Sequence, residues 1–183
     1  MTPPMKYTLE EHRHRFATWA AARAAQRGFT TSKKLIVALE SCGARQYLKD
    51  HLEDKIDPAK FLIHHKDWCG QIVLHLKRAG IEKVTWGRAA KLVAVYLKSM
   101  VIVGAGSYSP LAHVAHPPVD RVLLQNLARC KKLQSLHKAA WRKTNWTQLN
   151  EKSYDNLIDQ LRESLLPDEP FWALEKCWFP VAE

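Results

Sequence analysis

Apolar residues recur every three to four positions along most of this chain, and that spacing predicts amphipathic helices. The first helix is predicted from Thr8 to about Arg27. Thr8 and Glu11 have the spacing of a capping box, and Gly28 follows as a stop signal. Strict apolar–polar alternation, which would predict strands, is nearly absent. The pattern therefore predicts an all-α protein.

The same reading predicts the remaining helices and their connections. They cover residues 32–42, 44–53, 58–79, 87–103, 120–132, 153–165 and 170–178, and the helix at 120 could extend to Trp141. Asp57, which precedes Pro58, is predicted to cap the helix at 58. Residues 104–110 are predicted to form a loop, because they are rich in Gly, Ser and Pro. At 183 residues we expect one orthogonal domain of about eight helices, spanning 1–183.

Charge is unevenly distributed along this helical chain. Residues 77–143 hold thirteen Lys or Arg and only two acids, for a net charge of +11, whereas the whole chain carries +10. A solvated basic surface is one interpretation, and a nucleic-acid-binding segment is the other. The acids from Glu151 onward are expected to face away from bound DNA.

Asp120 and Lys91 are the two candidate reactive groups in the basic stretch. Asp120 follows two prolines and precedes an apolar helix, so it is predicted to cap that helix, which holds a carboxylate rigid and ionised. Lys91 lies near the start of another apolar helix, where burial and neighbouring cations would lower the pKa of its amine. An ordinary cap and a solvated lysine stripe that includes Lys98 are the alternatives.

Together these two segments resemble the helix-hairpin-helix DNA glycosylase superfamily. The motifs are Gly87-x-x-x-Lys91 and Pro118-Val-Asp120, each opening a helix, and the likeness is greatest to the small archaeal 8-oxoguanine DNA glycosylases. It covers residues 85–132. This chain has Trp86 and Ala89 where the family usually has proline and glycine. The chain also resembles an uncharacterised bacterial protein group, from which no activity follows.

The resemblance implies a glycosylase-like helical fold and assigns roles to individual residues. Lys91 would be the Schiff-base nucleophile, and Asp120 would stabilise the sugar cation. The hairpin turn that would bind phosphate through its backbone amides comprises Thr85, Trp86, Gly87, Arg88 and Ala89.

Other residues are expected to contact DNA or an extruded base. The basic candidates are Lys98, Arg121, Arg129, Lys131 and Lys132, with Lys138, Arg142 and Lys143 continuing the cluster around Trp141 and Trp146. Val95, Phe171 and Trp172 are candidates for the base pocket. Burial in the core is the alternative for each aromatic residue.

No cofactor or metal is expected. The four cysteines lack a CxxC pair, and the histidines lack a metal-binding motif. The chain has no apolar run of membrane-spanning length and no secretory signal, so we expect a monomeric cytoplasmic protein with reduced thiols.

The leading hypothesis is a DNA glycosylase, with or without lyase activity, that excises a damaged or modified base. It requires the Lys91 amine and the Asp120 carboxylate to share one open, cationic cleft. The alternatives are a non-catalytic DNA-binding module and a helical protein-interaction partner, for example in phage defence.

Overall fold

The computed structural model describes residues 7–52, 54, 56–104, 108–131 and 133–179. In these residues the secondary structure is helical throughout and contains no strand, which confirms the all-α prediction. The elements in chain order are α1 (Leu9–Gln26), α2 (Ser32–Glu40), α3 (Ala44–His51), α4 (Pro58–Arg78), α5 (Trp86–Leu97), the π-helical turn η1 (Lys98–Ile102), α6 (Pro110–Val114), α7 (Arg121–Arg129), α8 (Lys138–Lys143), the 3-10 turn η2 (Trp146–Gln148), α9 (Glu151–Arg162) and the 3-10 segment η3 (Phe171–Cys177).

Helix starts follow the capping residues that the sequence predicts. The Thr8 hydroxyl accepts a hydrogen bond from the Glu11 amide at 3.2 Å, and Asp57 accepts one from the Lys60 amide at 2.8 Å. Only half of the capping box forms, because the Glu11 carboxylate pairs with Arg15 and Arg45 instead. After α1, Arg27 and Gly28 both have positive φ, which reverses the chain.

The predictions are wrong between the regular helices. Pro110–Val114 forms the short helix α6, which was not predicted and which begins at the last residue of the expected 104–110 loop; residues 105–107 of that loop lie outside the described residues. The helix at 120 does not extend to Trp141, because Cys130 takes an extended conformation and α8 starts separately. The helix at 87 keeps α geometry only to Leu97. It then widens to a π turn, in which the Val103 amide bonds to the Lys98 carbonyl at 2.9 Å.

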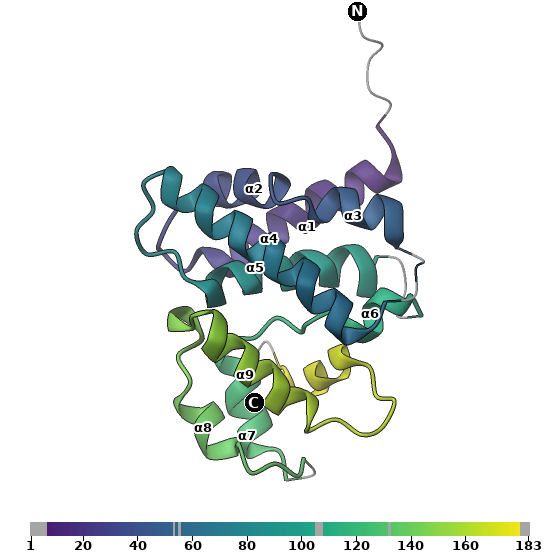
Figure 1. Ribbon diagram of the computed structural model, residues 1–183, viewed down its shortest axis with the longest axis vertical. Helices are drawn as coiled ribbons and strands as arrows, with labels where there is room; N and C mark the ends of the chain where they lie inside the picture. Colours follow the sequence, from purple (N-terminus) through teal and green to yellow (C-terminus); the bar gives the residue numbers. More distant parts are fainter. Residues whose placement is uncertain (1–6, 53, 55, 105–107, 132, 180–183) are drawn as a thin grey trace, which may run out of the picture.

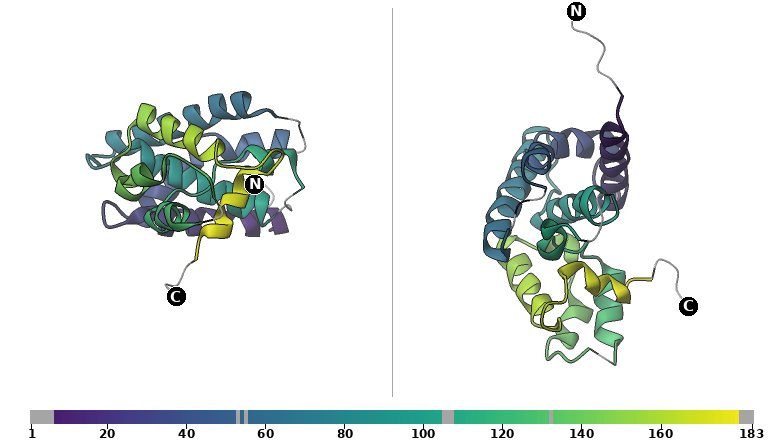
Figure 2. Two further views of the ribbon diagram at one scale, coloured as in Figure 1. Left: turned by 90° about the horizontal axis from the view of Figure 1, so that it is seen from below. Right: turned by 90° about the vertical axis from the view of Figure 1, so that its right-hand side faces the viewer.

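Helix α5 runs through the middle of the molecule. Helices α1 to α5 occupy the upper half of Figure 1, whereas α7, α8, α9 and η3 occupy the lower half, and the right-hand view of Figure 2 shows the same division. Helix α5 packs against α1 and α4 above and against η2 and α9 below. Nine of its twelve residues are buried, so a lysine in this helix is placed where water is largely excluded.

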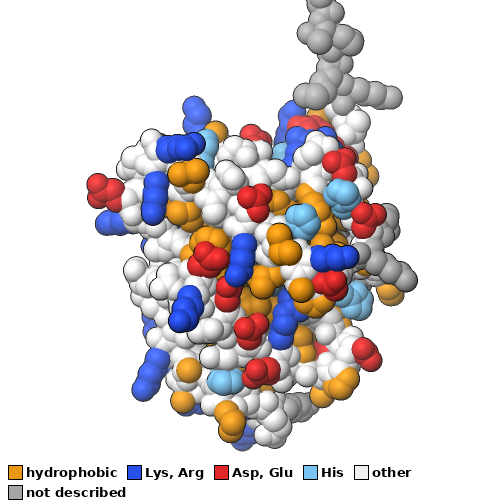
Figure 3. Space-filling view, viewed as in Figure 1, with side chains coloured by type: hydrophobic (Ala, Val, Ile, Leu, Met, Phe, Trp, Pro, Cys, Tyr) orange, Lys and Arg blue, Asp and Glu red, His pale blue; other side chains and the backbone are white. Residues whose placement is uncertain are grey.

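The surface is not uniformly basic. On the face shown in Figure 3, Lys and Arg side chains are interspersed with Asp and Glu. One such contact joins Lys66 of α4 to Asp155 of α9 at 2.7 Å. A face of mixed charge gives no extended attraction for a polyanion.

Candidate functional site

Asp120 caps helix α7, as the sequence predicts. Its Oδ1 accepts a hydrogen bond from the Leu123 amide at 2.8 Å, and its backbone is extended at φ −147°. Because one carboxylate oxygen is committed to the cap, the position of the other is fixed.

Lys91 and Asp120, which are 29 positions apart in sequence, meet between the two halves of the molecule. Lys91 Nζ donates to Asp120 Oδ2 at 2.9 Å. Both residues are buried, with exposed fractions of 4% for Lys91 and 6% for Asp120. The expectation that they share an open cleft is therefore half correct: the groups are together, but the cleft is closed in this structure.

Two indole rings close the site. Lys91 Nζ lies 4.7 Å from the centre of the Trp146 ring, a cation–π distance. From the C-terminal side, Trp178 Nε1 donates to Asp120 Oδ2 at 3.3 Å. Because the pair is buried, a substrate could reach it only if covering side chains moved, and these two tryptophans contact the pair directly.

The surroundings shift both pKa values downward. Burial lowers the pKa of the Lys91 ammonium, and the Asp120 charge opposes only part of that shift. Burial alone would raise the pKa of Asp120, but the Lys91 charge and the Leu123 amide outweigh it and lower that pKa. A lysine of lowered pKa is neutral more often at physiological pH, which is what a nucleophilic amine needs.

A second ion pair lies at Lys98, two helical turns after Lys91, where α5 continues into η1. Lys98 Nζ donates to Glu175 Oε1 at 2.6 Å, and Lys98 Nζ also lies 5.3 Å from the Trp178 ring centre. Burial raises the pKa of Glu175 despite this contact. Glu175, one of the acids expected to face away from bound DNA, thus pairs with one of the predicted DNA-binding lysines.

The predicted phosphate-binding turn is occupied by the chain itself. The Gly87 amide donates to the Leu149 carbonyl at 3.0 Å, and the Ala89 amide donates to the Thr85 carbonyl at 3.2 Å. The Thr85 hydroxyl accepts from the Arg88 amide and donates to the Thr147 carbonyl at 2.8 Å. These amides therefore have no free N–H to offer a phosphate in this structure.

Gly87 allows this close approach of the segment that carries Trp146. A Cβ atom at this position would clash with the Trp146 carbonyl and lie 3.2 Å from the Leu149 Cβ. The glycine of the Gly87-x-x-x-Lys91 motif thus serves the contact between α5 and η2, and this contact is what places an indole on Lys91.

The remaining predicted residues lie in several different surroundings. Phe171 is buried against His116 and beneath the Arg162 guanidinium. Arg88 packs on the Phe29 ring at 4.2 Å. Three further predicted site residues are half-buried and pack against the core, namely Trp86, Val95 and Trp172. The exposed cations are Arg121, Arg129 and Lys131, whereas Lys132 lies outside the described residues.

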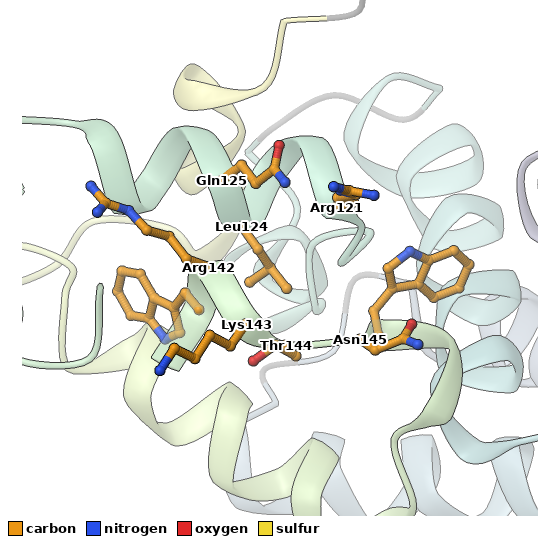
Figure 4. Close-up of a pocket in the computed structure, with 9 residues that line it drawn as sticks. Arg121, Leu124, Gln125, Arg142, Lys143, Thr144 and Asn145 are labelled. Atoms are coloured by element: carbon orange, nitrogen blue, oxygen red, sulfur yellow. The ribbon is translucent and has the colours of Figure 1, made fainter. Parts of the chain in front are cut away.

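A cavity of about 320 Å³ lies beside the ion pair, between α7 and the end of α8 (Figure 4). Its lining comprises Arg121, Leu124, Gln125, Trp141, Arg142, Lys143, Thr144, Asn145 and Trp146. Trp146 belongs both to this lining and to the cover of Lys91. The sequence signals this pocket only as basic residues interspersed with tryptophan, because its depth depends on how α8 packs on α7.

The described residues contain no group of three His, Cys, Asp or Glu side chains arranged to hold a metal ion. No helix in the described ranges combines the length and apolar character that a bilayer crossing requires. The part of the chain that is described thus forms an all-α protein with a buried lysine–aspartate pair. No protein-family model, curated protein or solved structure matches the chain.

Proposed function

We propose that this protein is a DNA N-glycosylase in which Lys91 is the nucleophile and Asp120 is the supporting carboxylate. The observation that carries the proposal is the 2.9 Å contact between Lys91 Nζ and Asp120 Oδ2 in the most basic part of the chain. The likeness of the two helix-opening motifs to the helix-hairpin-helix glycosylases supports the same chemistry, and it carries a glycosylase-like fold as part of the proposal.

The reaction begins with loss of one proton from the Lys91 ammonium to water, which the lowered pKa of Lys91 favours, whereas Asp120 stays ionised because its own pKa is lowered. The neutral amine attacks C1′ of the extruded nucleotide. The C1′–N bond breaks, and its electron pair leaves with the base, which takes up a proton. The ionised Asp120 stabilises the positive charge that develops on the sugar. The lysine nitrogen then loses a second proton, the C1′–O4′ bond breaks as the sugar ring opens, the ring oxygen takes up a proton, and a protonated imine joins Lys91 to C1′.

The closed site sets a requirement on this mechanism. Trp146 and Trp178 cover the pair from short segments, η2 and the chain after η3. DNA binding must displace at least one of these rings to bring C1′ within reach of Lys91. The energy for that displacement would come from DNA contacts elsewhere on the protein.

Excision assays with four proteins test the proposal. Wild type, Lys91→Gln, Asp120→Asn and the control Lys33→Gln, at an exposed lysine of α2, are incubated with duplexes that each carry one modified base or an abasic site. We expect product with wild type and Lys33→Gln, loss of product with Lys91→Gln, and a strong reduction with Asp120→Asn. Activity in a folded Lys91→Gln protein would contradict the assigned role.

A non-catalytic DNA-binding protein is the second candidate, and the 4% exposure of Lys91 favours it. In that case the ion pair only joins the two halves of the molecule. Wild type would then be retained on plain duplex DNA in a salt-dependent manner and would process none of the substrates. Absence of retention at low salt would instead favour a protein-interaction role.

A further inference from the structure

The pocket between α7 and α8 has a chemical character that differs from that of the ion pair. Three cations lie around it, Arg121, Arg142 and Lys143, and no acid belongs to its lining. All three side chains are exposed, and the Arg142 guanidinium also donates to the Ala128 carbonyl at 3.3 Å. The pocket can therefore neutralise phosphate groups.

The rest of the lining suits a nucleobase. Leu124, Trp141 and Trp146 form an apolar wall, whereas Gln125 and Asn145 contribute amides that can both donate and accept hydrogen bonds. The combination of cations, aromatic rings and amides is typical of sites that bind unpaired nucleotides. The volume of about 320 Å³ falls within the range of small-ligand pockets.

We infer that this pocket binds one nucleotide of single-stranded DNA, with its phosphates on Arg121, Arg142 and Lys143 and its base against the apolar wall. A half-open cavity of about 320 Å³ between two helices has room for a single unpaired nucleotide but not for a double helix. This inference rests on the proposed function only in taking DNA as the polymer. An undamaged strand is sufficient to occupy the pocket.

The shared wall connects the pocket to the reactive pair. Trp146 lines the pocket and lies on the Lys91 ammonium at 4.7 Å. A base that packs against this indole acts on the residue that has to move before Lys91 becomes accessible. A nucleotide next to the extruded one is therefore the natural occupant during the proposed reaction.

Fluorescence anisotropy with a labelled, undamaged oligothymidylate tests the inference. The double variant Arg121→Gln/Lys143→Gln should weaken binding roughly tenfold or more. The slope of log affinity against log salt should fall by about 0.7 for each lost phosphate contact. The charge-matched control Arg23→Gln/Lys33→Gln, on exposed residues of α1 and α2, should bind like wild type.

A second variant, Gln125→Glu, places a negative charge in the pocket while keeping the side-chain size. It should weaken oligothymidylate binding without altering the fold. Equal affinities and salt slopes for the pocket variants and the control would overturn the inference. Because this oligonucleotide has neither a damaged base nor an abasic site, it tests the pocket apart from excision. Binding that depends on the pocket, together with no product from any duplex of the excision assays, would contradict only the proposed glycosylase function.

Discussion

The two ion pairs that join the upper and lower halves differ in how fully water is removed. The side chains of Lys91 and Asp120 are 4% and 9% exposed, whereas those of Lys98 and Glu175 are 31% and 13% exposed. Both pairs link the α5–η1 helix to segments beyond residue 116, and Trp178 contacts both. The pairs thus offer a comparison within one molecule of a buried and a partly hydrated lysine–carboxylate contact.

The difference matters because burial has opposite consequences for stability and for chemistry. A buried charge is costly when it loses its partner, so the Lys91–Asp120 pair constrains the packing of the two halves. The same burial lowers the pKa of Lys91, whereas Lys98 reaches water. Of the two lysines, only Lys91 is desolvated in the way that a nucleophilic amine requires.

The largest expected effect comes from removing the buried cation. Lys91→Met leaves the Asp120 carboxylate buried without its partner, so the free energy of unfolding should fall by about 3–5 kcal/mol. Chemical denaturation measures this loss. The double variant Lys91→Met/Asp120→Asn should recover part of it, because the uncompensated charge is gone. If Lys91→Met were as stable as wild type, the pair would not contribute to the junction.

A substitution where α5 contacts η2 tests whether η2 limits access to Lys91, and it does so without changing any charge. Gly87→Ala places a methyl group against the Trp146 carbonyl, and relieving that clash should cost about 1–3 kcal/mol. As η2 shifts, Lys91 should become more reactive toward an amine-labelling reagent, which peptide mass spectrometry detects. Gly70→Ala, where an added Cβ meets nothing within 4 Å, is the matched control. Unchanged labelling of Lys91 in Gly87→Ala would show that η2 does not limit access.

The partly hydrated pair should be far less important for stability. Lys98→Met should lower the free energy of unfolding by about 1 kcal/mol, because Lys98 is partly exposed and because burial already raises the pKa of Glu175, so this carboxylate can take up a proton once Lys98 is gone. Thermal unfolding of Lys98→Met beside Lys91→Met measures the contrast. Equal losses in the two variants would remove the distinction between the pairs.

The smallest expected effects are changes in the free energy of unfolding with pH. The contributions of Asp120 and Glu175 to this free energy change in opposite directions as the pH falls. The lowered pKa of Asp120 means that its stabilising contribution is present above its unfolded value and is lost as pH falls through the lowered pKa. The raised pKa of Glu175 means that its ionised form destabilises the fold, and this cost disappears as pH falls toward the unfolded value of 4.5. The advantage of wild type over Asp120→Asn should therefore shrink in acid, whereas wild type should gain relative to Glu175→Gln.

Differences between variants are needed for this measurement because buried histidines also respond to acid. Burial lowers the pKa of His65 to about 3, so the folded protein keeps this ring neutral while the unfolded chain protonates below about 6.5. That destabilisation is common to wild type and both carboxylate variants, and it cancels when they are compared at one pH. The free energy of unfolding of each carboxylate variant, relative to wild type, is measured against pH. If this difference changed in the same direction for Asp120→Asn and Glu175→Gln, the opposite pH effects predicted for the two carboxylates would be contradicted.

The sequence predicts the regular helices well because their signals are local. Thr8, Asp57 and Asp120 each cap the helix that they were predicted to cap, and the apolar periodicity locates the central helix. The chain between 104 and 149 is less predictable, because α6, α8 and η2 are short segments held by packing rather than by their own propensity.

The sequence predicts which two residues form the candidate site, but it does not predict the tryptophans that cover them. Motif spacing pairs Lys91 with Asp120, and the structure joins them. The positions of Trp146 and Trp178 above the pair have no local signal, because they depend on contacts with residues about 55 positions away. The role of Gly87 differs for the same reason: the clash that it avoids involves a backbone carbonyl at residue 146.

Borohydride trapping followed by peptide mapping tests the central claim most directly. Wild-type protein is incubated with a duplex that contains an abasic site, whose C1′ aldehyde needs no prior base excision, and the imine is reduced with borohydride. The account predicts a covalent adduct that maps to Lys91 and is absent in folded Lys91→Gln. An adduct on a different amine, or none at all from a protein that binds the duplex, would contradict the assignment of Lys91 as the nucleophile.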